Sequence, residues 1–254
     1  MTRQSTAVQS VERAFAILES LAEAGGELSL SQLAGSSGLP MPTIYRLVRT
    51  LVQGGYVRQL PSRRYALGPR LINLGESASG MLADWAQPCL TKLVEELGET
   101  TNLSMLDGDR VTYVAQVPSP HAMRMFTEVG RRLHLHSTGA GKVLLATLSD
   151  RDVADIARRT GLPAQTEHTI TDLDVLVKEI RAVRQLGFAT DDGEQDVGVR
   201  CVAVPVLGGP SAFALSISGP AVRLTRELVN RAVPLLLSAA KDLAADLGAE
   251  RPSA

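Results

Sequence analysis

Histidine and cysteine side chains are the first candidates for chemistry in this sequence. His134 and His136 alternate in the segment LHLHS, so on a strand both imidazoles would share one face, where a third ligand would complete a zinc site. Cys201 with a distant histidine would form a nucleophile pair. No HExxH motif, CxxC motif or acid at a defined spacing accompanies them. We therefore expect no catalytic residue, metal site or cofactor, and Cys201 is expected to pack as a small hydrophobe.

Two segments of small and hydroxyl residues favour binding of a small anion instead. In the loop STGAG, residues 137–141, free N–H groups and the positive end of the following helix would hold a carboxylate. The loop lacks the upstream glycine of a P-loop and a hydroxyl residue after Lys142, so no nucleotide is expected. Ser216 and Ser218 alternate in a strand-like segment and offer two hydroxyls on one face. Tight helix packing explains the glycines equally well, and a solvated sheet edge explains the serines.

Arginines near the N-terminus indicate a third chemistry, the binding of a polyanion. Between Glu27 and Glu76 the sequence holds six arginines and no acid. Arg46 and Arg49 share the polar face of one predicted helix, and an acid-free face suits the base edges and phosphates of DNA. Arg63 and Arg64 lie in a turn and are expected to contact phosphate or the minor groove. The DNA-contacting residues expected from this pattern are Ser31, Thr43, Tyr45, Arg46, Arg49, Arg63 and Arg64.

The elements that must position these arginines have the order of a winged helix-turn-helix. Helical spacing is found over residues 10–24, a short serine-capped helix is expected over 28–34, and a second helix opens at Pro40 and Pro42. Two short strands around the turn PSRR then form a hairpin. This order of elements in about 60 residues is typical of a winged helix-turn-helix.

The remainder of the chain alternates strands and helices. We expect a hairpin within residues 102–115, strands at 201–206 and 212–218, and helices at 139–148, 150–160, 172–186 and 225–247. A connecting helix is expected over residues 68–82, and a separate helix between Pro88 and Gly98. The prediction is an α+β protein with a winged helix-turn-helix over 1–69, a linker helix over 70–84 and a ligand-binding domain over 85–254.

Composition indicates that only the first part of the chain meets a polyanion. The 254 residues are 44% hydrophobic with a net charge of −1, yet residues 1–75 carry eight arginines against four acids. No run of about 18 apolar residues and no signal peptide is present, and Cys89 and Cys201 lie too far apart for a disulfide framework. These features predict a cytoplasmic protein with no membrane segment.

Several motifs together resemble the IclR family of transcriptional regulators. The N-terminal stretch from SVERAFAILESL to SRRYALGPRL resembles the family's winged helix-turn-helix. The stretches LHLHSTGAGKVLLATL, GFATDDGEQDVGVRCVAVPV and ALSISGPAVRLT resemble its effector domain, so the likeness spans roughly residues 9–247. The family implies a GAF-like effector domain, a linker helix, homodimers often paired into tetramers, operator DNA as partner and a small organic acid as ligand.

The segment HAMRMFTEVGRRLHLHSTGAGK is most similar to the branch of allantoin-pathway repressors that sense glyoxylate or related ureides. In that branch the pocket uses the Gly-Ala pair of the GAGK loop, an Asp after the GF strand, the Cys of the next G-x-x-C segment and both serines of S-x-SGP. The matching effector-binding positions are Gly139, Ala140, Asp191, Cys201, Ser216 and Ser218.

The sequence therefore predicts a homo-oligomeric DNA-binding repressor whose effector is glyoxylate or allantoate, acting in allantoin or purine catabolism. Two alternatives stay open at this point. One is a regulator of aromatic-acid catabolism. The other is a small-molecule enzyme with an attached DNA-binding module.

Overall fold

The computed structural model of the chain describes residues 8–125, 128–208 and 211–249. It forms two compact units, Met1–Ala78 and Ser79–Ala254, each with its own sheet and hydrophobic core. The ends of the expected domain ranges, residues 1–7 and 250–254, lie outside this description. Helices and strands combine in the α+β arrangement that the sequence predicts.

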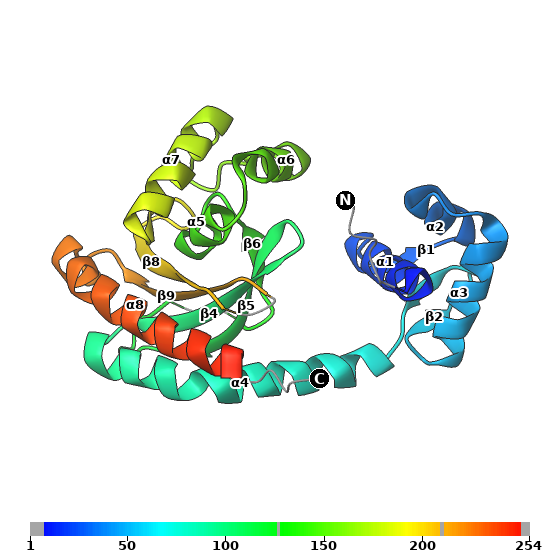
Figure 1. Ribbon diagram of the computed structural model, residues 1–254, viewed down its shortest axis with the longest axis horizontal. Helices are drawn as coiled ribbons and strands as arrows, with labels where there is room; N and C mark the ends of the chain where they lie inside the picture. The colour runs from blue at the N-terminus through cyan, green and yellow to red at the C-terminus, as the bar shows by residue number, and fades with distance from the viewer. Residues whose placement is uncertain (1–7, 126–127, 209–210, 250–254) are drawn as a thin grey trace. The chain divides into compact units, whose positions relative to one another are not determined.

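The first unit packs helices against a small sheet (Figure 1). Its elements are α1 (Gln9–Glu23), β1 (Glu27–Leu28), α2 (Leu30–Ser37), α3 (Met41–Gln53), β2 (Val57–Gln59) and β3 (Tyr65–Leu67). The strands pair antiparallel in the order β1-β3-β2. One buried cluster joins helices and sheet, formed by Ile17, Leu21, Leu33, Ile44, Val48, Leu51, Val57 and Tyr65. The unit is the winged helix-turn-helix that the sequence predicts.

Ser29 fixes the start of α2. Its Oγ accepts a hydrogen bond from the Gln32 N–H at 3.2 Å, and its own N–H donates to Gln32 Oε1 at 2.9 Å. This reciprocal capping box fixes the N-terminal end of α2 at Ser29. The prediction that Leu28 belongs to the helix is wrong, since Leu28 pairs with Tyr65 in β1.

Helix α4 (Arg70–Leu97) is one continuous helix where two were expected. Pro88 lies inside α4 and does not begin a new helix. A proline in a helix interior removes a hydrogen bond and crowds the preceding turn, at a cost of about 3 kcal/mol. The helix continues because Ala86 and Leu90, on either side of the proline, are fully buried in the core of the second unit. Tertiary packing therefore outweighs the local preference.

The second unit is a six-stranded antiparallel sheet covered by helices on both faces. Its further elements are β4 (Thr100–Asp107), β5 (Arg110–Val117), β6 (Arg132–His134), α5 (Gly139–Ala146), α6 (Asp150–Thr160), α7 (Leu173–Leu186), β7 (Ala189–Asp192), β8 (Val199–Val206), β9 (Phe213–Pro220) and α8 (Arg226–Ala249). The strand order is β6-β5-β4-β9-β8-β7. Helices α4 and α8 cover one face and α5, α6 and α7 the other (Figure 1).

The expected hairpin, strands and helices of this unit are present, with ends that differ by a few residues. The residue pattern did not predict β7. The family resemblance implied a strand that ends before Asp191, whereas Asp191 lies within β7. No helix in the described part of the chain is long and apolar enough to cross a membrane.

Candidate functional site

Helix α3 has one buried face and one exposed face. Ile44 and Val48 lie in the core of the first unit, whereas Tyr45 is 54% exposed and Arg46 and Arg49 are exposed as well. Because residues three and four apart share a helix face, Tyr45 and Arg49 project side by side. The structure thus brings three of the expected DNA-contacting residues together on one solvent-facing surface.

The other two residues of α2 and α3 that are expected to contact DNA, Thr43 and Ser31, differ in their exposure. Thr43 is half-buried near the start of α3. Ser31 is exposed in the first turn of α2, and its Oγ lies 2.9 Å from Ser29 Oγ, within hydrogen-bond distance. Ser31 therefore supports the capping box and also faces solvent.

The two arginines of the hairpin turn differ in their surroundings. Arg63 is exposed and adopts a left-handed backbone conformation, with φ of 62°. Arg64 donates from Nη2 to the Glu27 carbonyl oxygen at 2.7 Å, and its Nε lies 3.1 Å from Glu27 Oε1. Arg64 thus ties the hairpin to β1, whereas Arg63 is free to reach a phosphate.

Strand register gathers the expected effector-binding residues on one face of the larger sheet. Asp191 on β7 pairs with Cys201 on β8, and Cys201 pairs with Ser218 on β9. Ser216 lies two residues from Ser218, so its side chain points to the same face. Ser216 is fully buried, and the other three side chains are almost so. These four side chains form a buried polar patch on one face of the sheet.

The start of helix α5 lies over this patch. A Cβ added to Gly139 would lie 3.3 Å from Cys201 Sγ and 3.6 Å from the Asp191 backbone nitrogen. Thr138 caps the helix, because its Oγ1 accepts a hydrogen bond from the Gly141 N–H at 3.0 Å. The Ala140 backbone also forms a hydrogen bond with Cys201, so all six expected residues are brought together.

Asp191 is the acidic group of the patch. Its Oδ1 accepts a hydrogen bond from the Glu194 N–H at 2.7 Å. Burial, which outweighs this hydrogen bond, raises the pKa of the Asp191 carboxyl from its ordinary value of 3.8 to about 7, and the charge of Glu194 acts in the same direction. Near neutral pH the carboxyl is therefore partly protonated, and in that form it donates a hydrogen bond without repelling an anion.

Cys201 is held as a thiol. Burial and, to a smaller extent, the charge of Asp191 together raise the pKa of Cys201 to about 12. A thiolate is the nucleophilic form of cysteine, so this environment does not prepare Cys201 for covalent catalysis. Its side chain instead provides a small, soft wall of the patch.

A buried lysine, which the sequence did not identify as important, secures the loop that follows Asp191. Lys142 on α5 is only 1% exposed, and its Nζ lies 2.6 Å from Glu194 Oε1 and 3.2 Å from Glu179 Oε1. Ser137 Oγ also donates to Gln195 Oε1 at 2.7 Å. These bonds join the helix start to the loop, so the two sides of the patch are held in one arrangement.

Strands β4 and β5 add polar residues that the sequence interpretation missed. Asn102 donates from Nδ2 to Ser218 Oγ at 3.2 Å and accepts a hydrogen bond from Gln116 Nε2 at 2.8 Å. Ser104, two residues along β4, shares the same face and pairs in register with Tyr113 on β5. The sequence signal that could have identified Asn102 and Ser104 is the alternation of polar and apolar residues in TNLSM. It is similar to the alternation of the serines in SIS.

The two histidines do not form the paired strand ligands that the sequence suggested. His134 is the last residue of β6, and His136 lies beyond the strand, with Nε2 3.2 Å from the Pro163 carbonyl oxygen. Burial lowers the pKa of His134 to about 4, and that of His136 is lowered as well. In the described chain no group of three or more His, Cys, Asp or Glu side chains is placed to hold a metal ion.

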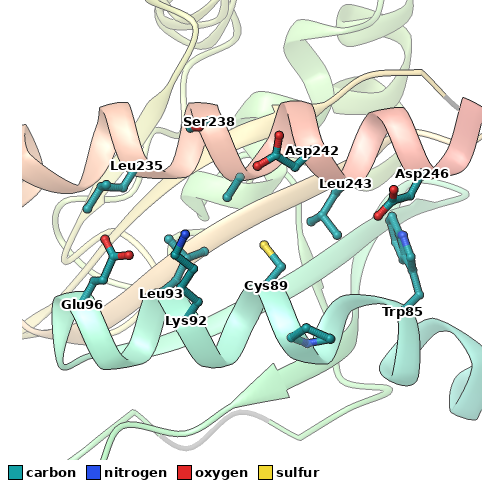
Figure 2. A pocket seen from close by; sticks show the side chains of 12 residues that line it. Trp85, Cys89, Lys92, Leu93, Glu96, Leu235, Ser238, Asp242, Leu243 and Asp246 are labelled. Carbon is teal, nitrogen blue, oxygen red and sulfur yellow. The ribbon is translucent and has the colours of Figure 1, made fainter.

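A separate hollow of about 240 Å³ lies between α4 and α8 (Figure 2). Cys89, Lys92 and Asp242 line it, and Trp85 closes one end. Burial raises the pKa of Cys89 to about 11. None of the residues expected from the sequence to bind DNA or effector lies in this hollow.

Comparisons with known proteins agree over both units. Residues 10–61 match the IclR helix-turn-helix domain, and residues 78–245 match the bacterial transcriptional regulator IclR C-terminal domain. The chain is 36% identical over 252 residues to the transcriptional repressor IclR of Escherichia coli (strain K12), which covers 96% of this chain and 92% of that protein. It is 34% identical over 251 residues to the transcriptional repressor AllR of Salmonella paratyphi A (strain ATCC 9150 / SARB42), which covers 97% and 92%.

Solved structures show the same fold. The crystal structure of a putative IclR transcriptional regulator from Silicibacter sp. TM1040 matches with a TM-score of 0.74 and 30% identity, over 96% of this chain and 98% of that one.

A winged helix-turn-helix with an exposed arginine helix, followed by a domain with a buried polar patch, defines a DNA-binding transcriptional regulator with a ligand-binding domain. The chain belongs to the IclR family of such regulators, whose members bind operator DNA and a small effector and are not enzymes. Because its identity to IclR and to AllR differs by only two percentage points, identity does not assign it to one branch.

Proposed function

We propose that this protein is a transcriptional repressor whose buried polar patch binds a small organic acid, with glyoxylate or allantoate as the preferred candidates. One observation carries the proposal. The start of α5 and the side chains of Asp191, Cys201, Ser216 and Ser218 converge from four separate segments on one buried face. Polar groups are costly to bury unless they are fully hydrogen-bonded, and a ligand that bonds to these groups would offset that cost.

The chemistry of the patch supports an oxo- or ureido-acid. The carboxylate would rest on the N–H groups of Gly139 and Ala140 at the positive end of α5. The hydrated form of glyoxylate has hydroxyls, and allantoate has ureido N–H groups, which donate to Asp191 when it is ionised. A plain carboxylate offers the ionised Asp191 no donor beyond the backbone N–H groups that already bond to Oδ1, and is disfavoured. A role in allantoin or purine catabolism follows from this ligand class.

The DNA-binding role is proposed for the exposed face of α3 and for the hairpin turn. Arg46 and Arg49 would contact bases in the major groove, and Arg63 would contact phosphate or the minor groove. Thr43, Tyr45 and Ser31 would complete the contact surface. Arg64 would contribute through its hold on the turn, since its guanidinium is already paired with Glu27.

We further propose a homodimer that pairs into a dimer of dimers and works in the cytoplasm. Support comes from an apolar groove of about 650 Å³ in the first unit, lined by α1, α3 and the start of α4. Phe15 on α1 is 59% exposed, and Val11 and Leu74 are half-exposed beside it. Apolar side chains gathered in this way favour burial against another protein surface.

A thermal-shift titration with glyoxylate, allantoate, allantoin and protocatechuate tests the ligand. Ligand at about 100 times its dissociation constant stabilises the folded form by roughly 2.7 kcal/mol, which raises the melting temperature by several degrees. Ser218→Ala should abolish the shift, and Ser238→Ala, in the hollow between α4 and α8, is the matched control. A shift with protocatechuate alone would replace the oxo- or ureido-acid with an aromatic one. A shift that Ser218→Ala leaves unchanged would place the ligand elsewhere.

A further inference from the structure

Two hydroxyls in the polar patch are buried and have no nitrogen or oxygen partner among the described residues, and one of them, that of Ser216, interacts only with the Cys201 thiol. They belong to Ser216 on β9 and to Ser104 on β4, both 0% exposed. Ser216 pairs in register with Asn102, and Ser104 lies two residues from Asn102 on the same face. An unpartnered buried hydroxyl is costly, and native structures seldom keep one without a function. Two on one face, diagonal to each other, indicate a missing partner between them.

Tyr113 marks the far side of the same surface. It pairs in register with Ser104, and its side chain is almost fully buried. Burial raises the pKa of Tyr113, and the charges of Cys201 and Asp191 raise it further, which places the phenol within electrostatic range of both groups. Three strands, β4, β9 and β8, lie between β5 and β7 in the sheet, so Tyr113 lies at the opposite end of the patch from Asp191.

We propose that Ser104 and Tyr113 form a second, neutral hydrogen-bonding subsite for the end of the effector opposite its carboxylate. This inference rests on the proposed effector site and adds a requirement for the ligand. The effector carries a hydroxyl, carbonyl or ureido group several atoms from its carboxylate. Among the two preferred candidates this favours allantoate, because glyoxylate has only two carbons and is too short to reach both ends.

The subsite consists of neutral groups. Ser104 offers one donor and two acceptor positions, and Tyr113 stays a protonated phenol because its pKa is raised. Asn102, two residues before Ser104, already accepts a hydrogen bond of 2.8 Å from Gln116, its partner in register on β5. The cation that acts on Tyr113 is Arg131, whose side chain is exposed, so a second carboxylate at this end would gain little from it and a dicarboxylic acid is disfavoured.

Matched ligand pairs test the subsite by isothermal titration calorimetry on the full chain. The pairs are allantoate with glyoxylate, and 4-hydroxybenzoate with benzoate. In at least one pair, the wild type should bind the member with the distal polar group more tightly. Ser104→Ala and Tyr113→Phe should weaken that member about three- to tenfold, the effect of one lost neutral hydrogen bond, and leave its partner unchanged.

The control variant lies on the opposite face of the same strand. Thr101 is buried, and its Oγ1 donates to the Leu90 carbonyl oxygen at 2.9 Å. Thr101→Val should lower the melting temperature and leave the ratio of affinities within each pair unchanged. Ser104→Ala should keep or raise the melting temperature, because it removes an unpartnered hydroxyl.

The outcomes separate this inference from the proposed function. Binding that requires Ser218 but does not respond to Ser104→Ala or Tyr113→Phe overturns the subsite alone. The same holds if the short member of each pair binds as tightly as the long one. No binding of any of the four acids, or binding that Ser218→Ala does not alter, contradicts both proposals.

Discussion

At the scale of single residues, the protonation of Asp191 links the patch to stability. Its folded-state pKa of about 7 exceeds the ordinary value of 3.8, so the fold favours the protonated carboxyl. The stability that this provides is fully present below about pH 4 and is lost as the pH rises through 7. The loss amounts to at most about 4 kcal/mol, from 1.36 kcal/mol for each pKa unit.

Asp191→Asn tests this dependence, since asparagine keeps the acceptor for the Glu194 N–H and cannot ionise. We expect the free energy of unfolding of the variant to rise relative to the wild type between pH 5 and pH 8, measured by urea denaturation. The other ionisable groups are the same in both proteins, so the difference isolates Asp191. Parallel curves over this range would show that Asp191 is ionised throughout.

Arg46 is expected to read a base. Arg46→Ala should weaken binding to a specific site by about 1–3 kcal/mol and have a smaller effect on random DNA, as measured by fluorescence anisotropy. Arg151→Ala is the control, because that side chain in α6 is 90% exposed and lies in the other unit. An equal loss on specific and random DNA would make Arg46 a phosphate contact.

At the scale of elements, two glycines at the start of α5 have different structural roles. A Cβ on Gly141 would lie 2.3 Å from the Leu135 carbonyl oxygen, a clash with backbone that no side chain can relieve. A Cβ on Gly139 would meet Cys201 Sγ at 3.3 Å, which a small shift accommodates. Gly141→Ala is therefore expected to cost about 3 kcal/mol or more, and Gly139→Ala about 1 kcal/mol.

Chemical denaturation and ligand titration of both variants test this distinction. Gly139→Ala should fold, but it should bind effector poorly because its methyl group enters the patch. If Gly139→Ala binds effector like the wild type, the start of α5 does not hold the ligand. If Gly141→Ala is as stable as the wild type, α5 does not pack as closely on residue 135 as the structure has it.

The sequence predicts elements well where local signals agree. The apolar spacing of α1 and α3, the serine cap of α2 and the Asp-Gly turn between β4 and β5 all depend on neighbours in the chain. Pro88 misled the prediction because the packing that holds α4 together comes from strands and α8, which are distant in sequence. β1, with two residues, is too short to show any period.

The candidate site was predictable only in part, for the same reason. A resemblance to a known family pointed to six residues of the patch, and the structure brings them together. Ser104 showed only the polar alternation of TNLSM, which does not say which face of β4 meets α5, because that depends on pairing with β9, more than 100 residues away. The burial of Lys142 is likewise a long-range effect, since lysine is rarely buried and its partners lie on α7 and in the loop after β7.

At the scale of the whole molecule, we expect self-association. The chain has a mass of 27.0 kDa, so light scattering should give about twice or four times that value. Phe15→Asp should lower the measured mass or weaken DNA binding, because it places a charge in the apolar groove of the first unit. Val222→Asp is the control, since Val222 is equally apolar, highly exposed and outside that groove. A monomer with full DNA affinity would contradict the proposed dimer.

The central claim is that occupancy of the patch controls DNA binding. The most direct measurement selects binding sites from random DNA with the full-length protein, then compares affinity for the selected site with and without the effector found by titration. The account predicts a two-fold symmetric site and a change in affinity of about 5- to 150-fold, with Ser218→Ala binding the site normally and ignoring the effector. Equal affinity with and without a bound effector, or selection of no common sequence, would contradict it.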